Sequence, residues 1–148
     1  MSETVEALKA LLRRAPNGLL STLSVRHGGT PFGSVVPFAL WRTGEPLLLL
    51  SGLAAHTKNL EADPRCSLLV TEPDSVDLQP ARATLVGLCA RLGEADEEAA
   101  RAAFTARHPD SEALQLPGFS PYVLAVQEVR WVGGFGAAAW LDGGRVRE

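Results

Sequence analysis

The chain has 148 residues, of which 46% are hydrophobic and 21% are charged, and this length is enough for a domain with its own hydrophobic core. Its 14 lysines and arginines against 17 aspartates and glutamates leave a net charge of −3, which offers no basic excess for nucleic acid or a membrane surface. The amino-terminal segment mixes charged and apolar residues, unlike a signal peptide. We therefore expect a single cytoplasmic domain over residues 1–148, with no nucleic-acid or membrane partner.

The first third of the chain predicts a helix followed by a hairpin. Apolar residues recur three or four positions apart in segment 1–15, which indicates a helix with one apolar stripe. Two strand-like runs follow, at residues 19–25 and 32–40. Gly28 and Gly29 lie between these runs and can supply the positive φ angles that a tight hairpin needs.

The middle of the chain predicts strand, helix and strand. The leucine-rich run 46–51 is typical of a buried strand. Residues 54–62 have helical composition, and Pro64 ends that helix. Residues 66–71 are a further strand candidate, and the polar stretch 72–80 is predicted to be a loop.

The last third adds two long elements and a short one. Residues 81–92 are a long strand candidate. Residues 94–107 indicate the clearest helix, because they are rich in alanine, with acids at the start and basic residues at the end. Residues 122–132 alternate as a strand does, the glycine-rich stretch 133–136 is a turn, and 137–141 form a last short strand. Hairpins dominate this order, so we expect an α+β domain: an antiparallel barrel with peripheral helices.

A phosphate cradle is predicted where the strand at Ser51 turns at Gly52 into the helix that begins near His56-Thr57-Lys58. The first turn of a helix has free N–H groups and a positive dipole end, and these three side chains add a ring donor, a hydroxyl and a positive charge. The alternative is that Thr57 only caps the helix while Lys58 is a solvated charge.

Two other segments could approach a flat ligand. Pro37 lies inside the run Pro31–Phe38 and cannot donate a ladder hydrogen bond, so we expect an edge strand, or a barrel that opens there beside a heteroaromatic ring. In the segment Arg130–Gly136, aromatic side chains flank glycines that permit close backbone approach. The alternative for Pro31–Phe38 is an edge strand that binds no ligand. The alternative for Arg130–Gly136 is a tight turn whose aromatic side chains belong to the core.

Other chemistries have little support in the sequence. Cys66 and Cys89 lie in apolar surroundings and are interpreted as two buried free thiols. His27, His56 and His108 are scattered without metal-ligand spacing, so no metal site is predicted. Serine-hydrolase, Walker A and Rossmann motifs are absent from the sequence.

Four blocks taken in this order carry a resemblance to a known family: PFGSVVPFAL, SGLAAHTKNLEADPRCSLLV, RATLVGLCARLG and RWVGGFGAAAWL. They resemble the FMN-binding split-barrel family that includes pyridoxamine 5′-phosphate oxidase, and within it the subgroup related to HugZ-type haem-degrading proteins. The resemblance implies an antiparallel split β-barrel with peripheral helices, FMN as cofactor and a homodimer. The implied cofactor-binding residues are Ser34, Val35, Val36, Pro37, Ser51, Gly52, His56, Thr57, Lys58, Arg82, Trp131 and Phe135.

The resemblance also implies roles for these residues. The strand Ser34–Pro37 would lie along the flavin, and His56-Thr57-Lys58 would hold the phosphate, with Lys58 as its counter-charge. Arg82 would reach the flavin ring. Trp131 and Phe135 would approach the cofactor from a C-terminal segment, commonly that of the partner subunit.

Three functions follow from this comparison of motifs. The first is an FMN-dependent oxidoreductase acting on an unknown small molecule, although the absence of arginines in Ser34–Pro37 argues against pyridoxamine phosphate as substrate. The second is a haem-binding or haem-degrading protein, in which His56 or His27 would ligate the iron. The third is a non-catalytic flavin carrier or sensor, because no residue stands out as a dedicated general acid or base.

Overall fold

A computed structural model describes residues 2–134 and 137–148, and within them eight strands form one antiparallel sheet. The strands are β1 (Asn17–Leu23), β2 (Pro31–Pro37), β3 (Ala39–Leu40), β4 (Pro46–Ser51), β5 (Arg65–Thr71), β6 (Arg82–Arg91), β7 (Phe119–Val132) and β8 (Ala138–Asp142). Their order is β2-β1-β5-β6-β7-β4-β3, and β8 pairs with β7. The helices are α1 (Ser2–Arg14), α2 (Ala55–Ala62) and α3 (Glu97–Arg107), with short 3₁₀ turns η1 (Glu94–Asp96), η2 (Glu112–Gln115) and η3 (Gly143–Arg145).

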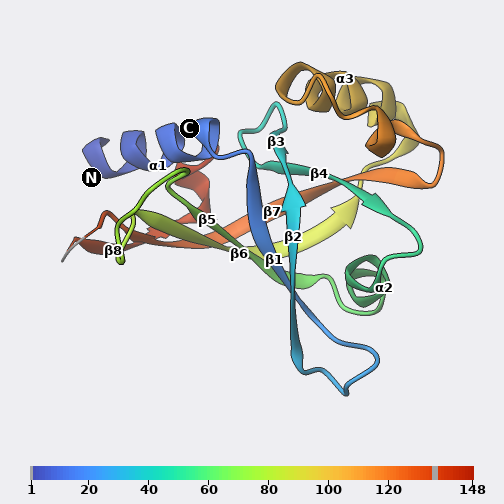
Figure 1. Ribbon diagram of the computed structural model, residues 1–148, viewed down its shortest axis with the longest axis horizontal. Coiled ribbons are helices and arrows are strands. Elements are labelled where there is room, and N and C mark those ends of the chain that lie inside the picture. Colours follow the sequence, from blue (N-terminus) through green and yellow to red (C-terminus); the bar gives the residue numbers. More distant parts are fainter. Residues whose placement is uncertain (1, 135–136) are drawn as a thin grey trace.

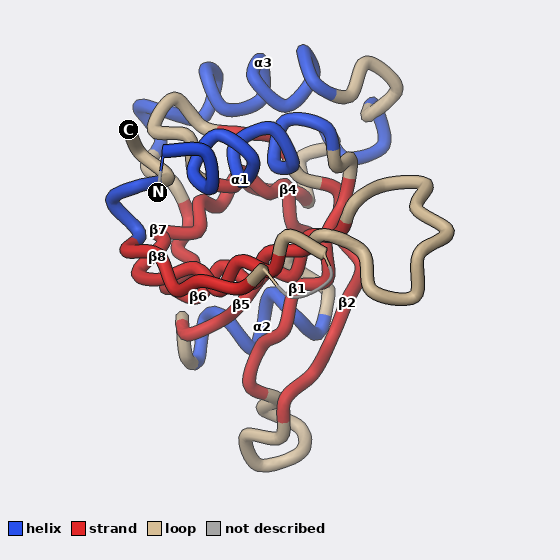
Figure 2. Tube along the Cα trace, turned by 90° about the vertical axis from the view of Figure 1, so that its left-hand side faces the viewer, coloured by secondary structure: helices blue, strands red, loops and turns tan. Residues whose placement is uncertain are grey.

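The sheet curls until its two edges are joined by one extended segment. β2 pairs with β1 at one edge and continues through Phe38 into β3, which pairs with β4 at the other edge. The change of partner follows Pro37, and the Phe38 N–H donates to the Pro16 carbonyl at 3.2 Å. Figure 2 shows the strands surrounding a central axis. The split barrel is confirmed, and the single strand expected over residues 32–40 is corrected to two.

Large aliphatic side chains fill the barrel, because each strand alternates between the inside and the outside. The fully buried set includes Leu20, Leu48, Leu50, Leu68, Leu85 and Leu124. α1 adds Leu8, Leu11 and Leu12 to the same core, as its predicted apolar stripe requires. A second, smaller core lies under α3, where Phe104 packs with Trp41, Leu47 and Leu49.

The three helices cover different parts of the barrel. In Figure 1, α1 and α3 lie above the strands and α2 lies at the opposite lower corner, beside the long β1–β2 hairpin. Arg107 at the end of α3 donates to the main-chain carbonyls of Leu12 and Ala15 and so joins α3 to the end of α1. None of the helices in the described part of the chain is long and apolar enough to cross a membrane.

Most predicted elements are present, with shifted ends. β1 begins at Asn17 and ends at Leu23, because Ser24 already belongs to the turn and accepts the Gly29 N–H at its carbonyl. The predicted positive φ angles are confirmed at Gly28 (64°) and Gly29 (93°). The helix predicted over 94–107 starts as the 3₁₀ turn η1 and continues as α3.

Candidate functional site

One row of side chains crosses the outer surface of six neighbouring strands. Direct register partners link its members, so all of them lie on the same face of the sheet. In order from β2 to β8 they are Val35, Leu19, Leu69, Thr84, Arg130 and Trp140. The neighbours Val35 and Leu19 are 70% and 38% exposed at one end of the row, and Trp140 is 57% exposed at the other end, which is unusual for large apolar side chains. We call this set the outer-face row.

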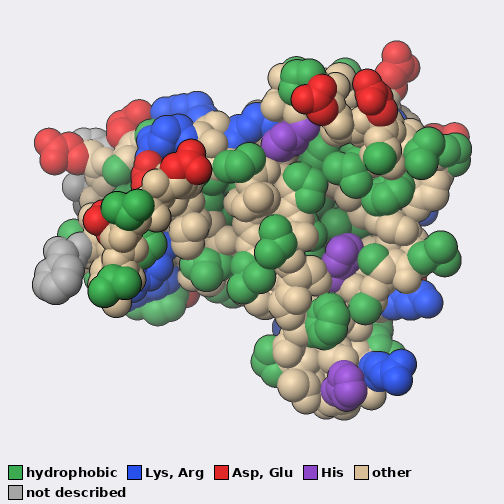
Figure 3. Space-filling view, viewed as in Figure 1, with side chains coloured by type: hydrophobic (Ala, Val, Ile, Leu, Met, Phe, Trp, Pro, Cys, Tyr) green, Lys and Arg blue, Asp and Glu red, His purple; other side chains and the backbone are tan. Residues whose placement is uncertain are grey.

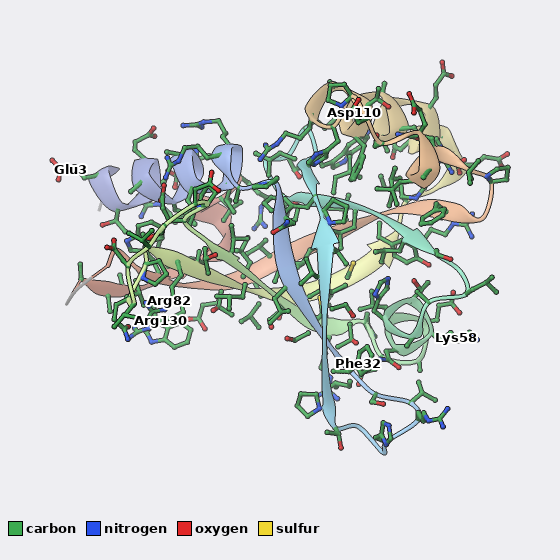
Figure 4. The ribbon with its side chains drawn as sticks, viewed as in Figure 1. Glu3, Phe32, Lys58, Arg82, Asp110 and Arg130 are labelled. Carbon is green, nitrogen blue, oxygen red and sulfur yellow. The ribbon has the colours of Figure 1, made fainter. Side chains whose placement is uncertain are left out.

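Two arginines stand at the β6–β7 end of this surface. Arg82 pairs in register with Val132, two residues beyond Arg130, so both arginines are on the outer face. The guanidinium carbon of Arg130 lies 5.1 Å from the centroid of the Trp140 ring, and Arg82 Nη1 donates to the Pro80 carbonyl at 3.0 Å. Figure 4 shows Arg82 and Arg130 side by side, far from Lys58. We call this pair the basic corner.

The start of α2 has free polar groups at the position predicted for a phosphate cradle. Ser51 ends β4, its hydroxyl accepts the Leu53 N–H at 3.2 Å, and its carbonyl accepts the Ala54 N–H at 3.2 Å. Ala54 supplies no side-chain cap to the helix. Thr57 is 1% exposed and its hydroxyl has no hydrogen-bond partner, while Lys58 is exposed. The Thr57 hydroxyl therefore caps nothing, contrary to the simpler interpretation of this residue.

His56 in the same turn is half-buried. Burial lowers the pKa of its imidazole from the ordinary value of 6.5, because the charged form is less well solvated there. The ring is therefore neutral at physiological pH. A neutral imidazole nitrogen can ligate a metal ion, whereas a protonated one cannot.

The predicted residues of β2 are divided between the two faces of the sheet. Val35 is directed outward, whereas Val36 is 3% exposed and belongs to the core. Ser34 and Pro37 are half-buried. Because neighbouring residues of a strand point to opposite faces, a ligand on the outer surface would contact side chains at alternate positions only and the backbone of the others.

The other predicted residues do not form one cluster within a single chain. Trp131 is 7% exposed and packs in the barrel core, and Phe135 lies outside the described residues. β5 follows α2 closely at Arg65 and ends at Thr71, which pairs with Arg82. From Arg65, next to α2, to Thr71, next to Arg82, β5 advances by six residues of about 3.3 Å each. The start of β5 near α2 and the basic corner therefore lie about 20 Å apart.

The sequence alone did not single out the outer-face row or the basic corner. Arg130 and Trp140 were visible as charged and aromatic residues near glycines, but their contact depends on the pairing of β7 with β8. The alternation of residues 122–132 could have placed Arg130 and Val132 on one face. No local signal placed Arg82 beside them.

Within residues 2–134 and 137–148, no group of three or more His, Cys, Asp or Glu side chains could hold a metal ion.

Known proteins support the family that the sequence motifs indicated. The family described as CREG, beta-barrel, matches residues 1–145. The chloroplastic non-canonical haem oxygenase HOZ of Arabidopsis thaliana is 39% identical over 140 residues, which cover 95% of this chain and 43% of HOZ. The relation to HugZ-type and pyridoxamine-phosphate-oxidase-like proteins is thereby confirmed at the level of the family.

Solved structures agree with this result. A haem-binding protein from Mycobacterium smegmatis is 34% identical, with a TM-score of 0.88 over 97% of this chain and 60% of that protein. A Listeria innocua protein named after pyridoxamine 5′-phosphate oxidase has a TM-score of 0.68 at 17% identity, over 88% of this chain and 98% of that one, and so shares the fold. The chain spans less than two thirds of the length of HOZ and of the mycobacterial protein.

Proposed function

We propose that this chain, which belongs to the CREG β-barrel family, binds haem in a site that two copies of the chain build together. The observation that carries the proposal is the outer-face row, a largely apolar surface with exposed apolar side chains at both ends, beside which Arg82 and Arg130 form the basic corner. HOZ and the mycobacterial protein, both at least 34% identical to this chain, are named for haem chemistry or haem binding.

The residues present fit the chemistry of haem. Its macrocycle is flat and apolar, and an exposed row containing Leu19, Val35 and Trp140 offers a surface of the same kind. Its two propionates are anionic, and Arg82 and Arg130 can form charge-assisted hydrogen bonds with carboxylates. His56 would hold the iron, because a neutral imidazole nitrogen can ligate a metal ion.

Each of these groups has a distinct task. His56 would ligate the iron, and its desolvation keeps the ring unprotonated for that purpose. The outer-face row would exclude water from one face of the ring. The basic corner would neutralise the propionates and orient the molecule. When bound, haem supplies iron-centred electron-transfer and oxygen chemistry, and the protein supplies position and electrostatics.

A second copy follows from the separation of the two halves of the site. The basic corner and α2 lie at opposite ends of β5, about 20 Å apart, so a single copy does not bring His56 to its own arginines. A two-fold partner packed on the outer face would cover the apolar row and present the partner subunit's Arg82 near His56. The homodimer expected from the sequence is thus part of this proposal.

Titration of the purified protein with haemin tests the proposal. We expect a Soret band that saturates at one haemin per site, and the spectrum of His-ligated iron. His56→Ala should remove the ligation signature, whereas His27→Ala, on the exposed tip of the hairpin, should keep it. Arg82→Ala combined with Arg130→Ala should weaken binding severalfold and leave the spectral signature unchanged.

Each outcome decides one part of the proposal. No saturable Soret change in the wild-type protein would refute haem binding. An unchanged spectrum in His56→Ala would refute the ligand assignment alone. A sedimentation velocity run that finds a monomer with haem still bound would refute the shared site.

The start of α2 favours FMN as a second candidate ligand. The first-turn N–H groups of α2 could receive a phosphate, and the exposed Lys58 could neutralise it. In that case the chain would be a flavin-dependent oxidoreductase or a flavin carrier. The fold shared with the Listeria protein is compatible with this alternative.

FMN titration with fluorescence detection separates the two candidates. FMN binding predicts saturable quenching in the wild type and a large loss of affinity in Lys58→Ala. The chain has one other lysine, so Lys9→Ala on α1 is the matched control and should bind as the wild type does. Haemin binding without flavin quenching would reject the second candidate.

A further inference from the structure

Two cysteines lie next to each other on adjacent strands, away from the outer-face row. Cys66 on β5 pairs in register with Gly87 on β6, and the Cys89 N–H donates to the Pro64 carbonyl at 2.9 Å. Cys89 therefore lies two residues along β6 from Gly87, the residue directly opposite Cys66. Both face the barrel interior and belong to the same core, so they are diagonal neighbours on one face.

Their surroundings differ in a way that assigns different roles to the two thiols. Cys89 is 1% exposed, whereas Cys66 is 8% exposed and contributes to the wall of an open depression of about 320 Å³ beside Ser21, Pro31 and Arg65. The neighbouring Cys89 thiol lowers the pKa of the Cys66 thiol, whereas the Cys66 thiol and burial raise the pKa of Cys89. Cys66 is thus the more exposed of the two residues and carries the better nucleophile.

We propose that Cys66 and Cys89 form a redox-active dithiol that hydrogen peroxide converts to a disulfide between β5 and β6. The Cys66 thiolate attacks one peroxide oxygen, the O–O bond breaks, and the products are a sulfenic acid and water once the leaving hydroxide is protonated. The Cys89 sulfur then attacks the sulfenic sulfur, an S–S bond forms, and a second water leaves with the Cys89 proton. Two thiols lose two electrons and two protons, and one peroxide becomes two waters.

The diagonal arrangement makes this disulfide reversible. Diagonal neighbours across a strand pair have Cα atoms about 7–8 Å apart, slightly more than the ~6.8 Å that an unstrained disulfide spans. Closure therefore requires a small local shift of β5 against β6, near the point where their pairing begins. Strained disulfides are reduced more readily than structural ones, so a dithiol reductant should restore the pair.

Peroxide treatment of the intact protein, followed by thiol counting in denaturant and by intact mass, tests the inference. We expect both thiols to disappear, the mass to fall by two hydrogen atoms, the band on a non-reducing gel to remain that of a single chain, and dithiothreitol to reverse the change. Persistence of both thiols, or addition of oxygen to Cys66 while Cys89 stays free, would overturn it. A disulfide-linked double chain would also overturn it.

Single-cysteine variants identify the order of events, provided that circular dichroism shows them to be folded. Cys89→Ala should instead gain oxygen at Cys66, and its Cys66 should react with iodoacetamide severalfold more slowly than in the wild type at neutral pH. Cys66→Ala should leave Cys89 unreactive in the folded protein. If Cys66 is alkylated at the same rate with and without Cys89, Cys89 does not activate the Cys66 thiol and this part of the inference is wrong.

Discussion

Asn59 and Thr22 join α2 to the barrel: Asn59 Nδ2 donates to Thr22 Oγ1 at 3.0 Å, and both residues are buried. The same amide accepts the Val25 N–H through Oδ1 at 3.0 Å. One side chain therefore satisfies two buried or half-buried polar groups of β1 and of the turn after it. Because His56 lies one helical turn earlier, this contact also determines where the proposed ligand sits.

Asn59→Ala should destabilise the protein by about 1–3 kcal/mol, because it leaves the Thr22 hydroxyl and the Val25 N–H without their partner. Urea unfolding followed by circular dichroism measures the difference. Asn17→Ala, at the exposed start of β1, is the matched control and should change stability by less than about 0.5 kcal/mol. Equal stability of the two variants would contradict the structural role of Asn59.

Glu45 is the second buried polar anchor, and it connects three distant segments. It is 6% exposed, and its Oε2 accepts the Val126 N–H at 2.8 Å and Arg147 Nη1 at 3.0 Å. Glu45→Ala leaves the buried Val126 N–H without a hydrogen-bond acceptor and should lower the free energy of unfolding by about 1–3 kcal/mol. Glu45→Gln keeps an acceptor and should cost less. Thermal and urea unfolding of both variants, with exposed Glu98→Ala as control, would reveal whether this order holds.

Gly87 allows β6 and β7 to approach at the bulge. A Cβ atom at this position would lie 2.0 Å from the Ala125 carbonyl oxygen, and backbone cannot move aside as a side chain can. Gly87→Ala should therefore cost at least about 3 kcal/mol. Gly93→Ala is the control, since a Cβ there meets nothing within 4 Å and its φ of −68° suits alanine. A stable Gly87→Ala protein would mean that the strand pair is looser than described.

Burial of His56 predicts a pH dependence of stability. Its pKa is lowered in the folded state, so between that pKa and 6.5 the unfolded chain binds more protons than the folded chain. The free energy of unfolding should therefore fall as pH falls below 6.5, and the loss should be complete below the folded pKa. In His56→Gln the fall should be smaller.

Urea unfolding at about pH 7.5 and about pH 5.5 would measure this effect, because the interval brackets the ordinary range of histidine titration. His27→Gln is the control for the loss of one histidine, since that residue is exposed on the hairpin. An identical pH dependence in wild type and His56→Gln would show that His56 is not desolvated in solution.

The surface of the molecule divides into a charged region along α1 and a hydrophobic region elsewhere. Figure 3 shows basic and acidic side chains together along α1, while hydrophobic side chains occupy much of the face between α3 and the β1–β2 hairpin. Val76 and Leu78, in the loop between β5 and β6, are each 96% exposed. Exposed aliphatic residues near the basic corner are compatible with a partner on that side of the sheet.

Local patterns determined the elements of this protein. The leucine run of β4, the alternation in β7 and the alanine-rich composition of α3 are each visible within about a dozen residues, and each predicts its element without reference to the rest of the chain. Pro37 likewise marked the opening of the barrel, because a missing N–H excludes a fully paired strand wherever it occurs.

The tertiary structure alone decided which of these elements meet. Strand register across β6, β7 and β8 brings Arg82, Arg130 and Trp140 to one corner, and the register of β5 with β6 places Cys66 beside Cys89. It also buries the Thr57 hydroxyl that the sequence offered as a surface donor. The physical reason is that pairing between strands depends on hydrogen bonds and packing among residues distant in the chain, which no local periodicity contains.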